Sequence, residues 1–294
     1  MSSQQTGQTC EQDGERAAPL CGDPEKEEQL RKQLQLLDRM GRIGRKVMVL
    51  SGKGGVGKST VAVNLAFVLA QAGKRVGLLD ADIHGPSIPA LLHLEGRTSA
   101  GASGDSLLPV MLENGIRVIS MGLLIASRDD AIIWRGPIKY KVIEQFLRSV
   151  EWGDLDFLIV DSPPGTGDEP LSVVQLLEKV DGAIVVTTPQ QVAISDVRKA
   201  ITFCRKVHLP VLGVLENMSG FVCPHCRKRV DIFQTGGGKA MAKDMGVPFL
   251  GSIPLDPDIV RSGDAGTPYV QAFAESEAAK AFHKAIEPIL KRLA

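Results

Sequence analysis

A glycine-rich segment, Gly52 to Ser59, follows the phosphate-loop pattern G-x-x-x-x-G-K-[ST]. Glycines let the backbone curl so that its N–H groups face an anion at the start of a helix, where the helix dipole also favours negative charge. In such a loop Lys58 reaches the β and γ phosphates, and the Ser59 hydroxyl completes the shell of a Mg²⁺ ion. The sequence therefore predicts a nucleoside triphosphate site, formed by Gly54, Gly55, Val56, Gly57, Lys58, Ser59 and Thr60.

A second lysine, Lys53, stands five residues before Lys58 inside the same glycine cradle. It can be a solvated loop residue. Its position favours a phosphate partner instead, either in its own subunit or across a dimer interface.

Acidic residues follow two of the expected strands. Asp161 ends an apolar run, where a parallel sheet places the carboxylate that holds Mg²⁺, usually through water. Asp80 and Asp82 follow another run, and one of the two is expected to orient the attacking water while the other supports the metal shell. Between Asp161 and Asp168, Gly165 is expected to offer its N–H to the γ phosphate in a switch-like loop.

Cys223 and Cys226 form a C-x-x-C pair, which is half of a zinc or iron–sulfur site. A symmetric dimer can supply the second pair, Cys10 and Cys21 can complete a mixed site, or the pair can act as a redox dithiol. Symmetry favours the dimer, because a two-fold axis supplies matching ligands automatically. Cys204 lies in a helical stretch and is expected to be a buried small hydrophobe.

Strand-like apolar runs alternate with helical stretches from Lys46 onward, which predicts an α/β fold with a mostly parallel central sheet between two layers of helices. The strand Lys46 to Leu50 and the helix Thr60 to Ala72 flank the phosphate loop in the required order. The other expected strands are Val76 to Leu79, Ile116 to Ser120, Phe157 to Val160, Ala183 to Thr187, Val211 to Leu215 and Phe249 to Ile253.

Composition limits the classes of partner. Lysine plus arginine and aspartate plus glutamate both number 34 in 294 residues, so no global charge favours nucleic acid. No apolar run is long enough to cross a membrane, and the amino terminus lacks the apolar core of a signal peptide. These features predict a cytoplasmic protein that binds neither nucleic acid nor membrane.

Three segments are expected along the chain. Residues 1–22 are polar and predicted to be disordered, and residues 23–44 form an amphipathic helix, with Leu30, Leu34 and Leu37 packing on the domain, followed by a linker. Residues 45–294 form the nucleotide-binding domain. Its last segment, Ala278 to Ala294, is expected to pack as a terminal helix interrupted by Pro288, although a membrane-targeting helix is the alternative.

Several motifs together resemble one family. Lys53 with Lys58 resembles the deviant phosphate loop of the MinD/ParA/nitrogenase-iron-protein superfamily, whose fold is a P-loop NTPase of the SIMIBI class. Within it, the segments 80–87, 134–137, 161–168 and 216–226 are similar to those of the Mrp (ApbC-type) iron–sulfur cluster carrier ATPases.

The resemblance implies roles for particular residues. Lys53 would act on the partner subunit's ATP, and Asp82 would position the water, which leaves Asp80 as the lesser catalytic candidate. Adenine would contact Asn217, Pro254 and Asp256.

At the metal site, the resemblance implies that Cys223 and Cys226 of two subunits share a 4Fe-4S cluster. The implied function is a homodimeric carrier that receives the cluster from upstream scaffolds and transfers it to apo iron–sulfur proteins. The alternative is a positioning ATPase with structural zinc.

Overall fold

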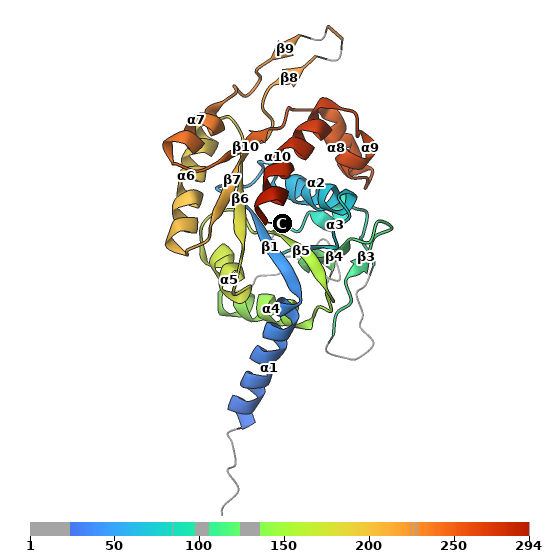
Figure 1. The fold of residues 1–294 in the computed structure, drawn as a ribbon, viewed down its shortest axis with the longest axis vertical. Helices are drawn as coiled ribbons and strands as arrows, with labels where there is room; N and C mark the ends of the chain where they lie inside the picture. The colour runs from blue at the N-terminus through green and yellow to red at the C-terminus, as the bar shows by residue number, and fades with distance from the viewer. Residues whose placement is uncertain are drawn as a thin grey trace, which may run out of the picture.

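A sheet with the strand order β10-β7-β6-β1-β5-β2-β4-β3 forms the centre of the computed structural model (Figure 1). The structure describes residues 24–83, 85–97, 106–123, 136–223, 225–226 and 228–293. The strands are β1 (Ile43–Ser51), β2 (Val76–Asp80), β3 (Val110–Met111), β4 (Arg117–Ser120), β5 (Leu155–Asp161), β6 (Gly182–Thr187), β7 (Val211–Glu216), β8 (Phe221–Val222), β9 (Arg229–Val230) and β10 (Phe249–Ser252).

The sheet pairs in parallel throughout, except that β3 is antiparallel to β4. Its central strands are buried on both faces, which explains their continuous runs of valine, isoleucine and leucine. The expected strands are therefore confirmed, with ends shifted by one to three residues. Asp80 and Asp161 prove to be the last residues of β2 and β5.

Helices cover both faces of this sheet and complete the predicted three layers. They are α1 (Pro24–Gly41), α2 (Lys58–Gln71), α3 (Ile88–Leu91), α4 (Gly136–Ser149), α5 (Asp168–Leu176), α6 (Gln191–Lys206), α7 (Gly237–Asp244), α8 (Pro257–Asp264), α9 (Tyr269–Ala272) and α10 (Glu277–Leu293), with a short 3₁₀ turn at Met121–Leu123. Helices α2, α9 and α10 pack into one core cluster, whereas α1, α4 and α5 pack into a second and α6 and α7 into a third (Figure 1).

Helix α1 packs differently from the sequence expectation. Leu36 and Met40 are buried against the second core cluster, whereas Leu30, Leu34 and Leu37 are exposed. Only the end of the helix meets the domain, and its first turns project away from it (Figure 1). The expected linker up to residue 44 is also absent, because β1 already begins at Ile43.

The carboxyl-terminal helix α10 is part of the core. Phe282, Ile286 and Ile289 are buried among α2 and neighbouring strands. The helix continues through Pro288, so the expected interruption there is wrong. Within the described ranges, no helix combines the length and apolar character needed to span a membrane.

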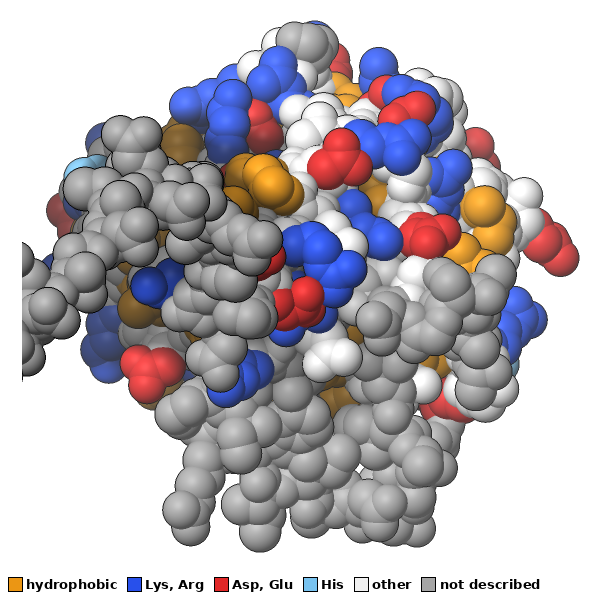
Figure 2. Space-filling view, turned by 90° about the horizontal axis from the view of Figure 1, so that it is seen from below, with side chains coloured by type: hydrophobic (Ala, Val, Ile, Leu, Met, Phe, Trp, Pro, Cys, Tyr) orange, Lys and Arg blue, Asp and Glu red, His pale blue; other side chains and the backbone are white. Residues whose placement is uncertain are grey.

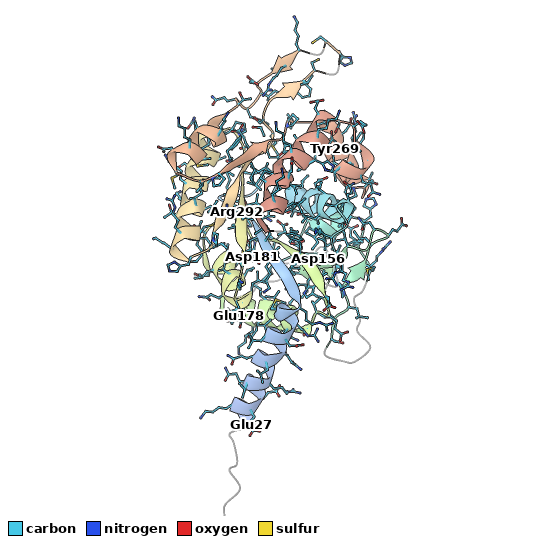
Figure 3. The ribbon with its side chains drawn as sticks, in the orientation of Figure 1. Glu27, Asp156, Glu178, Asp181, Tyr269 and Arg292 are labelled. Atoms are coloured by element: carbon cyan, nitrogen blue, oxygen red, sulfur yellow. The ribbon has the colours of Figure 1, made fainter. Side chains whose placement is uncertain are left out.

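Two half-buried carboxylates, Asp181 and Asp156, fix the edge of the sheet where the parallel strands begin (Figure 3). Asp181, just before β6, accepts hydrogen bonds from the Lys46 backbone N–H at 2.8 Å and the Arg45 guanidinium at 3.2 Å. Asp156 in β5 accepts from the Arg75 backbone N–H at 2.8 Å and from the Arg75 guanidinium at 2.9 Å. These bonds tie neighbouring strands together at the end away from the phosphate loop.

The packing of α1 predicts that two leucines, which lie two residues apart, contribute differently to the free energy of unfolding. Leu36→Ala removes a side chain that is 7% exposed and is expected to lower the free energy of unfolding by about 2 kcal/mol. Leu34→Ala removes one that is 56% exposed and should change it by less than about 0.5 kcal/mol. Urea unfolding of both variants measures this difference, and equal losses would show that Leu34 also packs in solution.

Candidate nucleotide and thiol sites

The phosphate loop connects β1 to the start of α2, as predicted. Gly57 precedes α2 with φ +84°, and a Cβ at this position would lie 2.2 Å from Nδ2 of Asn217. A Cβ at Gly52 would lie 2.3 Å from the backbone carbon of Asp196 in α6. These two positions therefore require glycine for different reasons: a left-handed backbone at Gly57 and the close approach of α6 at Gly52.

A buried ion pair lies where the phosphate loop joins α2. Lys58 Nζ lies 2.5 Å from Asp161 Oδ1 and 3.4 Å from Ser59 Oγ, and both charged side chains are buried. Burial raises the pKa of Asp161, and the positive charge of Lys58 opposes that rise. Asp161 Oδ2 is buried and has no hydrogen-bond partner among the described residues. The structure thus unites Lys58, Ser59 and Asp161, and leaves one carboxylate oxygen available to a cation.

Asp80 is fully buried beside this pair and serves the loop that follows β2. Its carboxylate accepts hydrogen bonds from the Asp82 N–H at 3.1 Å, the Ile88 N–H at 3.2 Å and the Ser120 hydroxyl at 2.9 Å. Asp82 accepts from the Gly85 N–H at 3.1 Å, and its negative charge raises the pKa of Asp161. Asp82 is therefore the more exposed of the two carboxylates, while Asp80 orders the backbone from Asp82 to Ile88.

The remaining loop residues are placed as follows. The N–H of Gly165 donates to the Ser51 carbonyl at 2.9 Å, so in this structure it is bonded to protein and not directed to a phosphate. Lys53 is half-buried, and its ammonium group has no hydrogen bond or ion pair with another described residue. Its backbone carbonyl accepts from the Ser51 hydroxyl at 2.9 Å, which holds the loop at its first turn.

The expected adenine contacts lie along two adjacent segments. Asn217 donates from Nδ2 to the Val56 carbonyl at 2.9 Å, so this amide supports the phosphate loop directly. The Leu255 N–H donates to the Gly220 carbonyl, which brings the segment containing Pro254 beside the one containing Asn217. Asp256 caps α8 by accepting from the Asp258 N–H at 2.9 Å, and it also accepts from Tyr269 Oη at 2.5 Å. Contact of these residues with adenine stays a prediction.

Glu216 has a role that the sequence did not reveal. This buried carboxylate accepts from the Ser219 hydroxyl at 2.6 Å and from the N–H groups of Gly236 at 2.9 Å and Gly238 at 2.5 Å. It therefore joins the end of β7 to the start of α7. The available signal was a charged residue at the end of the apolar run Val211 to Leu215.

The two thiols lie in the turn of a hairpin, β8–β9, that projects from the body of the domain (Figure 1). Cys223 is half-buried and Cys226 is exposed. The Cys223 N–H donates to the Lys228 carbonyl at 3.0 Å and closes the turn. The backbone N–H groups of Cys226 and His225 lower the pKa of the Cys223 thiol, which favours the thiolate form that binds metals.

The described residues hold no group of three or more histidine, cysteine or acidic side chains able to bind a metal. Within them the C-x-x-C pair has no third protein ligand, and its role as half of a four-ligand site stays a prediction. Cys204 is buried, and burial raises the pKa of its thiol to about 12, which confirms the expectation of a small hydrophobe. Cys10, Cys21, His84 and Trp134 lie outside the described residues.

The environment of Asp80 predicts a pH dependence of stability. Burial, with the negative charge of Asp161, raises its pKa from 3.8 to about 8. Between those values the folded chain keeps a proton that the unfolded chain loses, so the free energy of unfolding falls as pH rises, by up to about 1.4 kcal/mol per pH unit. Asp80→Asn cannot ionise and is expected to reduce this slope between pH 5 and 7 in urea unfolding.

Asp244 is exposed and forms an ion pair with Arg198, and it provides the control. Asp244→Asn should leave the slope unchanged. An unchanged slope in Asp80→Asn as well would show that Asp80 ionises normally in the folded chain.

Known proteins similar to this chain share its fold and its length. The family model for ParA, described as NUBPL iron-transfer P-loop NTPase, matches residues 42–290. The iron-sulfur cluster carrier protein of Methanocaldococcus jannaschii is 47% identical over 260 residues, covering 88% of each chain. The cytosolic Fe-S cluster assembly factor NUBP2 of Bos taurus is 51% identical over 249 residues, covering 83% of this chain and 91% of the relative.

Solved structures also resemble this chain. A nucleotide-binding protein of Archaeoglobus fulgidus in complex with ADP superposes with a TM-score of 0.70 at 39% identity, covering 84% of this chain and 98% of that one. The cell division ATPase MinD of Pyrococcus furiosus gives a TM-score of 0.63 at 26% identity, covering 85% and 99%. The chain belongs to the ParA family of NUBPL-type iron-transfer P-loop NTPases.

Proposed function

We propose that this chain is an ATP-dependent carrier that binds a 4Fe-4S cluster as cargo between two copies of itself and transfers it to apo iron–sulfur proteins. The names of its relatives support cluster handling. The observation that carries the proposal is the connection between the thiol hairpin and the phosphate loop. Both are attached at the end of β7, through the adjacent residues Glu216 and Asn217.

This connection consists of two sets of hydrogen bonds, one made by Asn217 and one made by Glu216. Asn217 binds the Val56 carbonyl of the phosphate loop, and the chain then runs directly into β8 and the thiols. Glu216 binds the N–H groups of Gly236 and Gly238, where the chain returns from β9. A displacement of the phosphate loop therefore moves the anchor of the hairpin. This gives a physical path by which nucleotide occupancy changes the approach of the two thiol pairs.

The nucleotide site supports phosphoryl transfer to water. Lys58 would leave Asp161 to bind the β and γ phosphates, and Ser59 with Asp161 would hold Mg²⁺, whose positive charge stabilises the developing negative charge. The orphaned Oδ2 of Asp161 fits this donor set. Asp82 would orient the attacking water, and Asp80 would hold Asp82 in place through its backbone N–H. Lys53 would reach the nucleotide of the partner subunit.

Two contacts would then exchange partners with the nucleotide state. The Gly165 N–H would leave the Ser51 carbonyl for the γ phosphate, and Lys58 would leave Asp161. Each group keeps a partner in both states, so neither state leaves a buried donor unsatisfied. The switch loop would be ordered by triphosphate in one position and by Ser51 in the other.

The thiols, the packing of α10, the charge balance and the name of one relative support proposals about partners and location. Cys223 and Cys226 of two subunits would supply the four thiolates of the cluster, and upstream scaffolds would load it. The apolar face of α10 is buried in the core, which argues against a membrane-targeting role. The two charge types balance, which argues against nucleic acid. A cytoplasmic location agrees with the word cytosolic in the name of NUBP2.

Anaerobic reconstitution with iron and sulfide tests the cluster. About four iron and four sulfide per dimer are expected, with the absorption and EPR spectra of a 4Fe-4S centre. The Cys223→Ala, Cys226→Ala double variant should lose them and still bind nucleotide, whereas Cys204→Ala, which removes a buried thiol, should keep them. Stoichiometric zinc that iron does not displace would favour a regulatory ATPase with a structural metal instead.

Mixed dimers test whether Lys53 acts across the interface. Lys53→Ala and Asp82→Asn homodimers should both be inactive. If Lys53 serves the partner's site, a dimer with one chain of each type has one intact site, because both lesions fall on the other site. Random pairing of equal amounts should then restore about a quarter of the wild-type ATP turnover. No recovery in dimers shown to be mixed would place Lys53 in the site of its own subunit.

A further inference from the structure

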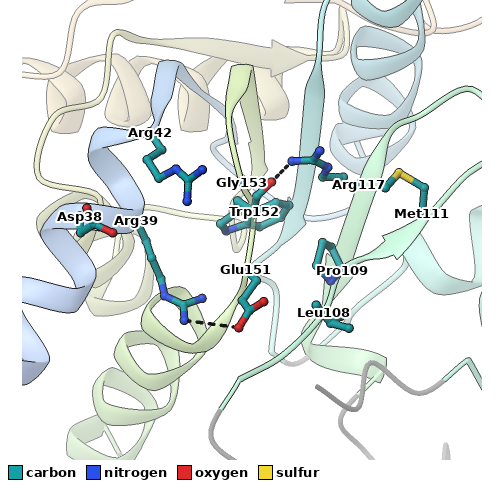
Figure 4. Close-up of a pocket in the computed structure, with 10 residues that line it drawn as sticks. All are labelled: Asp38, Arg39, Arg42, Leu108, Pro109, Met111, Arg117, Glu151, Trp152 and Gly153. Atoms are coloured by element: carbon teal, nitrogen blue, oxygen red, sulfur yellow. Dashed lines mark hydrogen bonds and ion pairs between the residues drawn. The ribbon is translucent and has the colours of Figure 1, made fainter. Parts of the chain in front are cut away.

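A cavity of about 580 Å³ lies at the opposite edge of the sheet from the phosphate loop (Figure 4). Its walls come from the end of α1, from β3 and the start of β4, and from the residues just before β5. The volume is in the range that holds small organic ligands. Its lining is Asp38, Arg39, Arg42, Leu108, Pro109, Met111, Arg117, Glu151, Trp152 and Gly153.

Three arginines are each held in the wall by part of their donor set. Arg39 donates to the Ser149 carbonyl at 3.0 Å, Arg42 Nε donates to Asp154 at 3.0 Å, and Arg117 donates from Nη1 to the Trp152 carbonyl. A guanidinium has five N–H groups in a planar fork. These hydrogen bonds hold the three arginine side chains in place. Each guanidinium keeps further N–H groups that can bind an anion.

The wall around Arg117 is built for that side chain. Gly153 has φ +62°, and a Cβ there would lie 2.6 Å from Arg117 Nη1. A larger residue would strain the backbone and displace the guanidinium. Figure 4 shows Arg42 and Arg117 on either side of Trp152.

Trp152 adds an unusual donor. Its indole is buried, and Nε1 has no hydrogen-bond partner. Across the described residues, only this atom and Asp161 Oδ2 are buried side-chain nitrogen or oxygen atoms without a partner. The second is the oxygen proposed above to bind the cation, and the first belongs to a residue that lines this cavity, although the atom itself is buried.

The opposite wall is apolar and accessible. Leu108 and Met111 are 42% and 57% exposed, and Pro109 lies between them. The face seen from the α1 end carries positive, negative and hydrophobic side chains intermingled in its described part, without a broad basic patch (Figure 2). Recognition of an anion here must therefore come from the cavity itself.

We propose that this cavity binds an organic monoanion, a single carboxylate or sulfonate group on an apolar body. The three guanidiniums would receive the head group, and Leu108, Pro109 and Met111 would receive the body. The carboxylates of Asp38 and Glu151, together with Asp154 paired to Arg42, balance the three guanidiniums. Because the site has no excess positive charge, a single anionic group fits it better than a polyphosphate.

The matched dyes 1-anilinonaphthalene-8-sulfonate and N-phenyl-1-naphthylamine test this chemistry, because they differ by one sulfonate. Fluorescence titration should show tighter binding of the sulfonate. The chain has two tryptophans. Trp134→Phe therefore leaves Trp152 as the sole tryptophan donor, and transfer to bound dye would show that the dye lies within energy-transfer range of the cavity wall. Equal affinity for the two dyes, or no transfer, would contradict the proposal.

Variants separate the head-group contact from general hydrophobic adsorption. Arg117→Gln and the more exposed Arg42→Gln should each weaken sulfonate binding about tenfold or more and leave the uncharged dye unaffected. Met111→Asp should weaken both dyes. Arg198→Gln, which also removes an exposed arginine paired with an aspartate, is the control and should change neither. Unchanged sulfonate affinity in Arg42→Gln, whose wild-type side chain is 54% exposed, would overturn the proposal.

Two displacers identify the source of the anion. Displacement by decanoate would assign a free small-molecule acid, and displacement by an acetylated trileucine with a free carboxyl terminus would assign the end of a peptide chain. Displacement by neither at millimolar concentration would contradict the proposal.

Discussion

The buried ion pair between Lys58 and Asp161 is the interaction on which the nucleotide site depends. A charged side chain in a dry environment is costly unless an opposite charge and hydrogen bonds compensate it. Here Asp161 is the last residue of β5 and Lys58 is the first residue of α2, and the fold brings them together. The negative charge of Asp161 and the positive charge of Lys58 therefore compensate each other. The arrangement remains incomplete, because Asp161 keeps one oxygen unpaired. In the proposed function, a phosphate and a cation together would complete what the protein alone leaves unsatisfied.

The end of β7 connects this site to the thiols. Glu216 and Asn217 are adjacent in the chain, yet their side chains bind different partners: one the return from the hairpin, the other the phosphate loop. Rigid elements with short, saturated hydrogen-bond networks move as units. The projecting hairpin is therefore anchored at the same strand end that supports the phosphate loop, and under the proposed function its position would depend on that loop.

The two edges of the sheet have different chemistry. At the carboxyl edge, Asp80, Asp161 and Glu216 are buried with specific donors and act on loops. At the amino edge, Asp156 and Asp181 pair with basic residues and fix strands, and the arginine-lined cavity lies beside them. Parallel strands produce this asymmetry, since every strand begins at one edge and ends at the other.

The sequence by itself determined the phosphate loop, the parallel sheet and the C-x-x-C turn, because each depends on local spacing: glycines that permit a tight loop, apolar runs that must be buried, and two thiols within one turn. Only the tertiary structure decided which leucines of α1 pack, that Pro288 lies within α10, that Gly165 binds Ser51, and that Glu216 joins β7 to α7. Helical spacing identifies a stripe but not its partner, and a hydrogen bond between residues far apart in the chain exists only once the sheet brings them together. The cavity around Trp152 is such a case, since its walls come from four separate segments.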